Sequence, residues 1–241
     1  MSSVPAQLRN VPHAGVRDGE LVRSILLVVL SASSGSVDAV SWLGLGKVFS
    51  GFMTGNLVFV GFRAGGAAGP SVPRVLAALA AFCVGALVCG LVVRRVRDTR
   101  PVWSRRVTLA LTGGLVAQTV FFVVWVSVGG DPSAAAGDLL IALSSFAMGV
   151  QSAAIFSLGL RAVFTTAFTA TLTVFFGDLS GWTQARGERC RLLAVALAVF
   201  AGAALGAVLF DRAERWAPAL PLGLTACSVA AAAAAFGARA D

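Results

Sequence analysis

The sequence predicts an all-α membrane protein that crosses the bilayer six times, and three observations lead to this prediction. Hydrophobic residues make up 57% and charged residues only 12% of the 241 residues, and the mean hydropathy is +0.86. The charged residues are gathered in clusters, which divide the chain into long apolar segments. The basic residues favour one side of the membrane when six of these segments cross it.

Six of the eight apolar segments are long enough for a transmembrane helix, which needs roughly 17–25 residues. We expect these spans within residues 24–46, 75–93, 107–130, 139–160, 192–210 and 216–238. The apolar segment after the polar residues 1–23 is too long for a signal-peptide core, so we expect a retained helix. The two shorter segments, 48–62 and 162–177, are rich in Gly, Ser and Thr. This composition favours two short re-entrant or broken helices buried among their neighbours.

The basic residues decide the predicted topology. If all eight segments crossed with the amino terminus inside, 9 of the 19 basic residues would lie inside and 10 outside. With six crossings the division becomes 14 inside and 5 outside, as the positive-inside rule requires. The loop with Asp131 and Asp138 has no basic residue and falls outside. We therefore expect six crossings with both termini in the cytoplasm.

The two halves of the chain resemble each other. Residues 50–57 align with residues 165–172 at an offset of 115, and polar residues face polar residues at 50, 54 and 56. We expect one membrane domain built from a first repeat over 24–130 and a second over 131–241, preceded by a cytoplasmic polar tail over 1–23. Six crossings make these repeats antiparallel, as in many secondary transporters. The alternative is a chance alignment of apolar segments with a limited alphabet.

One polar stripe lies within the first span. Its residues are spaced 3, 4 and 3 apart and share one helix face: Ser31, Ser34, Asp38 and Ser41. An ionised carboxylate at this depth is costly unless it is protonated, paired or hydrated. The stripe should therefore face protein, with Asp38 as a proton or cation site. The structural alternative is a hydrogen bond that only packs helices.

Further polar residues inside apolar segments need partners at depth. Thr54 and Asn56 lie beside the Gly51-x-x-x-Gly55 motif, and two glutamines lie within long spans. The candidate substrate or proton site consists of Asp38, Ser34, Ser41, Thr54, Asn56, Gln118, Gln151, Thr165 and Thr169. Packing alone is the alternative for the threonines, because a hydroxyl in a helix often bonds the carbonyl of the preceding turn.

Several classes of protein are disfavoured. The four cysteines form no Cys-x-x-Cys motif and the single histidine, His13, lies before the first span, so we expect no metal site, no cofactor and no enzyme activity. The net charge of +8 fits basic membrane loops and anionic lipids better than nucleic acid. The expected partners are the lipid bilayer and a small solute or ion, and an oligomer is compatible with the sequence.

Two motifs resemble a known family. The run over residues 35–41 (GSVDAVS), followed by Phe49 and residues 53–57 (MTGNL), is similar to the signature of the YoaK-like family of bacterial integral membrane proteins. The resemblance covers nearly the whole chain, since Gln151, Ala153 and the pair Thr165-Thr166 also match. Ser152 replaces an expected Asn, and Ala170 stands where Thr-Gly is usual. The resemblance implies a small multi-spanning inner-membrane protein, often suspected to be a transporter.

Together these features lead to one functional hypothesis and one alternative. The hypothesis is a secondary transporter or exporter of a small solute, with Asp38 as the proton or cation group. The alternative is a non-transporting helper or scaffold protein whose polar residues only pack helices. A water-lined cavity that reaches Asp38 would favour the first, and a solid bundle would favour the second.

Overall fold

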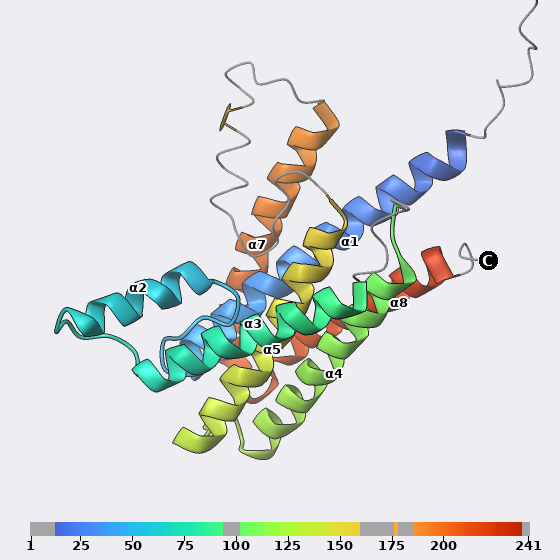
Figure 1. Ribbon diagram of the computed structural model, residues 1–241. Helices are drawn as coiled ribbons and strands as arrows, with labels where there is room; N and C mark the ends of the chain where they lie inside the picture. The colour runs from blue at the N-terminus through green and yellow to red at the C-terminus, as the bar shows by residue number, and fades with distance from the viewer. Residues whose placement is uncertain (1–12, 94–101, 160–175, 178–185, 238–241) are drawn as a thin grey trace, which may run out of the picture.

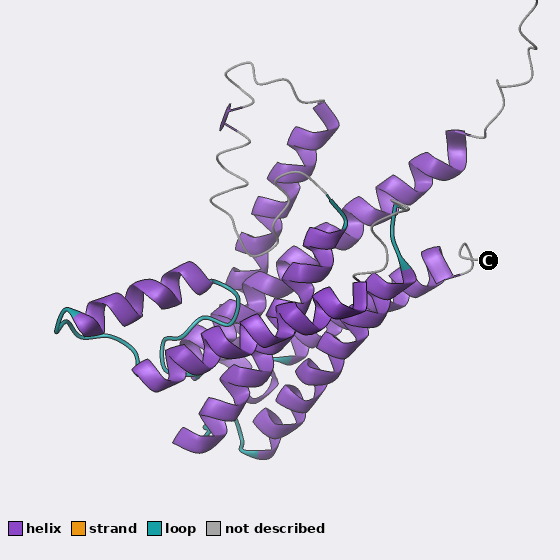
Figure 2. Cartoon of the chain, in the orientation of Figure 1, coloured by secondary structure: helices purple, strands orange, loops and turns teal. Residues whose placement is uncertain are grey.

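The computed structural model describes residues 13–93, 102–159, 176–177 and 186–237. Over these ranges the chain forms helices joined by loops, without a β-strand (Figure 2). The helices are α1 (His13–Gly44), α2 (Met53–Ala64), α3 (Val72–Val93), α4 (Arg105–Ser127), α5 (Ala134–Ser157), α7 (Arg186–Ala213), the short 3₁₀ helix η2 (Glu214–Trp216) and α8 (Ala219–Phe236). The prediction of an all-α protein is confirmed for the part of the chain described here.

Six of these helices are long and apolar enough to cross a membrane: α1, α3, α4, α5, α7 and α8. Each contains most of one predicted span, so the prediction of six long apolar helices is confirmed. The first short segment forms a loop over residues 48–52 followed by α2, which has 12 residues and is too short to cross a bilayer. Nearly all of the second short segment, 162–177, lies outside the described residues.

Helices α1 and α5 form the centre of the bundle (Figure 1). In each of them 61% of the most apolar 18-residue stretch is buried, compared with 22–39% in the other four spans. Helix α1 packs mainly on α7 and α8, and α5 packs mainly on α3 and α4. Helix α2 lies at the edge of the bundle, beside α3.

The closest helix contacts occur where glycines allow two backbones to meet. A Cβ atom at Gly202 of α7 would overlap the Ala32 carbonyl of α1, and one at Gly85 of α3 would overlap the Phe146 carbonyl of α5. Close approach of this kind, which only a missing side chain permits, is a common way of packing helices inside a membrane. The α1–α7 and α3–α5 pairs are therefore fixed by backbone contact.

Helix α1 ends in a left-handed turn. Gly46 and Lys47 have φ angles of 77° and 65°, and the Lys47 amide donates to the Trp42 carbonyl at 3.2 Å. This bond, from the second residue beyond the helix cap, is the closing bond of a Schellman motif. The turn reverses the chain and brings the 48–52 loop back against α1.

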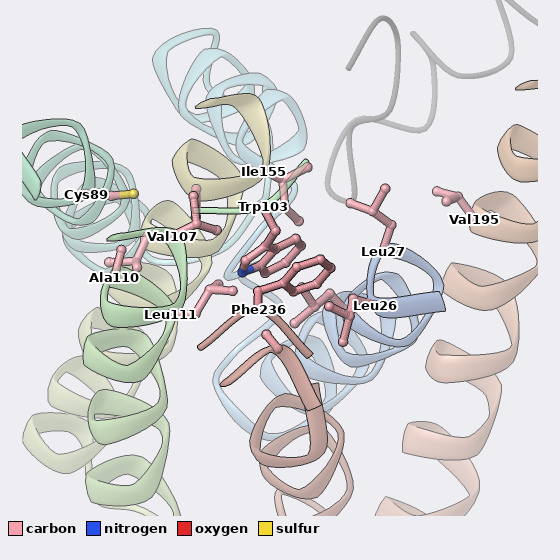
Figure 3. Close-up of a cluster of buried hydrophobic side chains, with 14 of the residues drawn as sticks. Leu26, Leu27, Cys89, Trp103, Val107, Ala110, Leu111, Ile155, Val195 and Phe236 are labelled. Carbon is pink, nitrogen blue, oxygen red and sulfur yellow. The ribbon is translucent and has the colours of Figure 1, made fainter. Parts of the chain in front are cut away.

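The buried side chains form two apolar clusters with polar residues between them. The first cluster joins the beginning of α1 to the end of α8, where Trp103 and Phe236 stack at 5.8 Å between ring centroids (Figure 3). The second contains Val40 of α1, Phe121 and Trp125 of α4 and the beginning of α5.

Along α1, α4, α5 and α8, the residues between the clusters include most of the buried polar side chains. We call this set the polar layer; it consists of Ser31, Ser33, Ser34, Ser36, Gln118, Ser144, Ser145, Thr225 and Ser228. Between its two apolar clusters the bundle thus buries polar side chains together with apolar ones.

Candidate functional site

The serines of the predicted α1 stripe are buried. Ser31, Ser34 and Ser41 are at most 2% exposed, as expected for a stripe that faces protein. Ser31 Oγ donates to the Leu27 carbonyl at 2.6 Å and Ser41 Oγ donates to the Asp38 carbonyl at 3.2 Å. These two hydroxyls are thus used within α1, which is the usual outcome for a serine in a membrane helix.

The Asp38 carboxylate holds the 48–52 loop. Its Oδ1 accepts hydrogen bonds from the backbone amides of Ser50 at 2.9 Å and Gly51 at 2.7 Å. Hydrogen bonds to an ionised carboxylate are roughly twice as strong as those between neutral groups. The deep carboxylate that the sequence singles out is therefore paired with the backbone of a loop instead of a basic side chain.

Asn56 holds the same loop from the other side. Its Nδ2 donates to the Phe49 carbonyl at 2.7 Å, and its Oδ1 accepts from the Phe49 amide at 3.0 Å. The Asn56 side chain is fully buried. Asp38 and Asn56 therefore bind three consecutive loop residues, 49–51. Thr54, predicted to share their site, is exposed on α2.

A hydrogen bond connects this loop to α5. Ser50 Oγ lies 2.6 Å from Ser144 Oγ, and both residues are buried. Ser50 also donates its amide to Asp38, so one residue contacts both the carboxylate and α5. Ser50 and Ser144 are not among the site residues predicted from the sequence. The Ser144-Ser145 pair in the middle of an apolar span was the available signal, because buried hydroxyls often join membrane helices.

Ser144 also lines a narrow cavity between α1, α4, α5 and the beginning of α8. The lining residues are Val37, Val40, Gln118, Phe121, Ser144, Pro218, Pro221 and Leu222. The cavity leaves room for about one ordered water molecule. Gln118 and Ser144 of the polar layer line it, and Ser144 and Ser50 connect it to Asp38.

The two glutamines of the predicted site lie in different surroundings. Gln118 lines the cavity and is 7% exposed, and its Oε1 has no hydrogen-bond donor within reach among the described residues. Gln151 donates to the Leu30 carbonyl at 3.1 Å and thereby joins α5 to α1, away from the cavity lining. Thr165 and Thr169 lie outside the described residues.

The site combines neutral hydrogen-bonding side chains with the carboxylate of Asp38. In the described residues no group of three or more His, Cys, Asp or Glu side chains could hold a metal ion. In and beside the cavity lie the buried Gln118 amide, the buried hydroxyls of Ser144 and Ser50, and the Asp38 carboxylate, which backbone amides hold.

These features define a multi-pass α-helical membrane protein with a polar interior. Residues 26–231 match the family model described as Protein of unknown function (DUF1275), and the chain belongs to this family. It is 32% identical over 159 residues to the UPF0700 transmembrane protein YoaK of Bacillus subtilis (strain 168), a match that covers 66% of this chain and 68% of that protein. No solved structure gives a significant match. The resemblance to the YoaK-like family is thereby confirmed.

Proposed function

We propose that the chain is a secondary transporter or exporter of a small solute in the bacterial inner membrane, with six crossings and both termini in the cytoplasm. The observation that carries the proposal is the hydrogen-bonded path from the cavity to Asp38. Ser144 lines the cavity, its hydroxyl lies 2.6 Å from that of Ser50, and the Ser50 amide donates to Asp38. Two serines thus separate a solute bound in the cavity from the Asp38 carboxylate.

Protonation of Asp38 would couple a proton to the cavity through this path. A neutral carboxyl group accepts amide hydrogen bonds more weakly than a carboxylate does. Proton binding would therefore loosen the hold of Asp38 on Ser50 and Gly51, and Ser50 would pass the change to Ser144. A ligand shifts such an equilibrium by its differential affinity for the two states. The proposal thus requires solute affinity to differ between the two protonation states.

Related helix contacts in the two halves support the proposed internal repeat. Gly35 of α1 meets the backbone of Val199 in α7, and Gly149 of α5 meets the backbone of Phe82 in α3. Gly149 lies 114 positions after Gly35, and Val199 lies 117 positions after Phe82. The contact between Gly202 and the Ala32 carbonyl has the same offsets from the contact between Gly85 and the Phe146 carbonyl.

The direction of the central helices supports an inverted arrangement of these repeats. Helix α1 runs from the first apolar cluster, at Leu26, to the second, at Val40. Helix α5 runs the other way, from Leu140 in the second cluster to Ile155 in the first. Repeats over 24–130 and 131–241 would therefore face opposite sides of the membrane, an arrangement on which many transporters build alternating access.

The test is a solute screen in proteoliposomes of the purified chain, with and without a pH gradient. We expect at least one small solute to move faster with the gradient, and Asp38→Asn to abolish this dependence while the protein still folds. Asp211→Asn, which changes an exposed carboxylate at the end of α7, is the matched control and should keep it. A folded protein that moves no solute in the screen would favour the non-transporting helper or scaffold.

A further inference from the structure

The lining of the cavity limits the chemistry of what it binds. Six of its residues are apolar: Val37, Val40, Phe121, Pro218, Pro221 and Leu222. The two polar ones, Gln118 and Ser144, are neutral. A charged solute would lose its hydration here without meeting an opposite charge, which is strongly unfavourable. The lining therefore selects for an uncharged molecule.

Among the described residues, the Gln118 amide oxygen has a hydrogen-bond capacity that no donor uses. Its Oε1 is buried and has no donor within reach among the residues described here. A buried acceptor that stays unpaired is costly, and the majority of such groups in proteins find a partner. Because Gln118 lines the cavity, a ligand there with an N–H or O–H group would satisfy this acceptor.

Ser144 adds a second acceptor to the cavity. Its hydroxyl lies 3.3 Å from the Ile141 carbonyl and 2.6 Å from Ser50 Oγ. A hydroxyl has one donor and two acceptor positions. If Ser144 donates to Ile141 and accepts from Ser50, one acceptor position is left. Gln118 Oε1 and Ser144 Oγ thus each offer an acceptor position to the cavity, and a ligand that donates hydrogen bonds would match both.

We infer that this cavity is the binding site for a small uncharged molecule that donates hydrogen bonds to Gln118 Oε1 and Ser144 Oγ. Its apolar part lies against Val37, Val40 and Phe121. The inference rests on the proposed function and names the substrate class, which is small neutral amides and alcohols. Because the cavity now holds only about one water molecule, it must widen to admit such a ligand.

A protection experiment on the full-length chain in detergent tests the site. The four native cysteines are replaced by alanine, and Leu222→Cys then introduces a reporter thiol in the cavity lining. Mass spectrometry follows the rate at which N-ethylmaleimide modifies this thiol. The competitors are propionamide, propionate and propylammonium, which are similar in size and differ in charge. Val120→Cys, at an exposed position of α4, is the matched control.

Propionamide should slow modification of the Leu222→Cys chain, and the two ions should leave its rate unchanged. The rate at the Val120→Cys control should not respond to any competitor. Adding Gln118→Leu, which removes the amide and nearly preserves the volume, should weaken propionamide protection about tenfold, since one buried hydrogen bond is lost. Ser144→Ala provides a second, smaller change and should weaken protection in the same direction.

Three results would overturn the inference: equal protection by all three competitors, protection by none, and full protection in both the Gln118→Leu and the Ser144→Ala chain. The second result would mean that the cavity holds only water. The flux assay for the proposed function is independent of this one. If propionamide protects the thiol but is not transported, the binding site is supported and the transport function is not. If a solute is transported but no competitor protects the thiol, the transport function is supported and this binding site is not.

Discussion

Arg74 Nε donates to Asp138 Oδ1 at 2.7 Å and so joins the beginning of α3 to the beginning of α5. The same guanidinium also donates to the Ala134 carbonyl at 3.1 Å and lies 3.5 Å from the Leu45 carbonyl. Arg74 therefore ties together three helix ends, including the turn that closes α1. Among the described residues Asp138 pairs with Arg74 alone, and its side chain is half exposed.

Because Arg74 makes more contacts than Asp138, its substitution should lower the stability of the protein more. Asp138→Asn should lower stability by less than about 1 kcal/mol, because exposed ion pairs contribute little. Arg74→Leu should lower it by about 1–3 kcal/mol, because the contacts to the Ala134 and Leu45 carbonyls are lost together with the ion pair. Unfolding of the detergent-solubilised variants by SDS measures both. Equal effects would contradict a role for Arg74 beyond the ion pair.

Asn56 should be critical for stability and Thr54 should not. Asn56→Asp replaces the donor that serves the Phe49 carbonyl, and it leaves that buried carbonyl facing a carboxylate. We expect a loss of about 1–3 kcal/mol, the range for an unsatisfied buried polar group. Thr54→Ala, at an exposed position of the same helix, should stay within about 0.5 kcal/mol of the parent. Thermal melting in detergent compares the two, and a reversed order would refute the assignment of the loop contacts.

Alanine substitutions should distinguish glycines that pack against the backbone of a neighbouring helix from a glycine with open space around it. Gly202→Ala and Gly85→Ala each place a methyl group on a backbone carbonyl of the neighbouring helix, so the helices must move apart. Overpacking of this kind typically costs about 1–3 kcal/mol. Gly113→Ala is the matched control, because nothing lies within 4 Å of the added atom. There the better helix propensity of alanine should stabilise by up to about 1 kcal/mol.

The proposed repeat makes a further prediction about the two glycines at helix contacts. Gly202→Ala and Gly85→Ala should have similar effects on the melting temperature, since their contacts are equivalent under the proposed repeat. A large effect of one and none of the other would count against equivalent halves. A destabilised Gly113→Ala chain would show that the assay responds to any alanine on a membrane helix.

The topology can be tested by labelling single cysteines in intact cells. In a chain without native cysteines, Asp98→Cys should react with a membrane-impermeant thiol reagent only after the cells are permeabilised. Asp131→Cys, in the loop between α4 and α5, should react in intact cells. This expectation rests on the 14 to 5 division of basic residues. Labelling of both from the same side would rule out six crossings.

The long helices were predictable because a membrane span is encoded by length and apolarity alone. The 24–46 and 139–160 segments thus correspond to α1 and α5 without any knowledge of their neighbours. The burial of Ser31, Ser34 and Ser41 was also predictable, because the helical spacing puts them on one face with Asp38.

The partners of these residues were not predictable. Asp38 binds backbone amides at residues 50 and 51, and backbone groups leave no mark in the sequence. Gln118 and Gln151 look equivalent as amides within apolar spans, yet only Gln118 lines the cavity. The difference depends on how α4, α5 and α8 pack, which the pattern of one segment does not specify. The Ser50–Ser144 contact joins residues 94 positions apart, so it too depends on how the helices pack.

The polar face of α1 has a consequence for how the protein is made. Helix α1 has the lowest mean hydropathy of the six candidate spans, because Asp38 and several serines interrupt its apolar residues. On its own it would partition into lipid less favourably than α3 or α7. Its principal partner, α7, is synthesised more than 140 residues later. The 48–52 loop can cover Asp38 soon after α1 is made, but Ser33 of α1 pairs with Thr225 of α8, which is made still later than α7. During synthesis this part of α1 must therefore be covered by the translocation machinery or by other helices until α7 and α8 are in place.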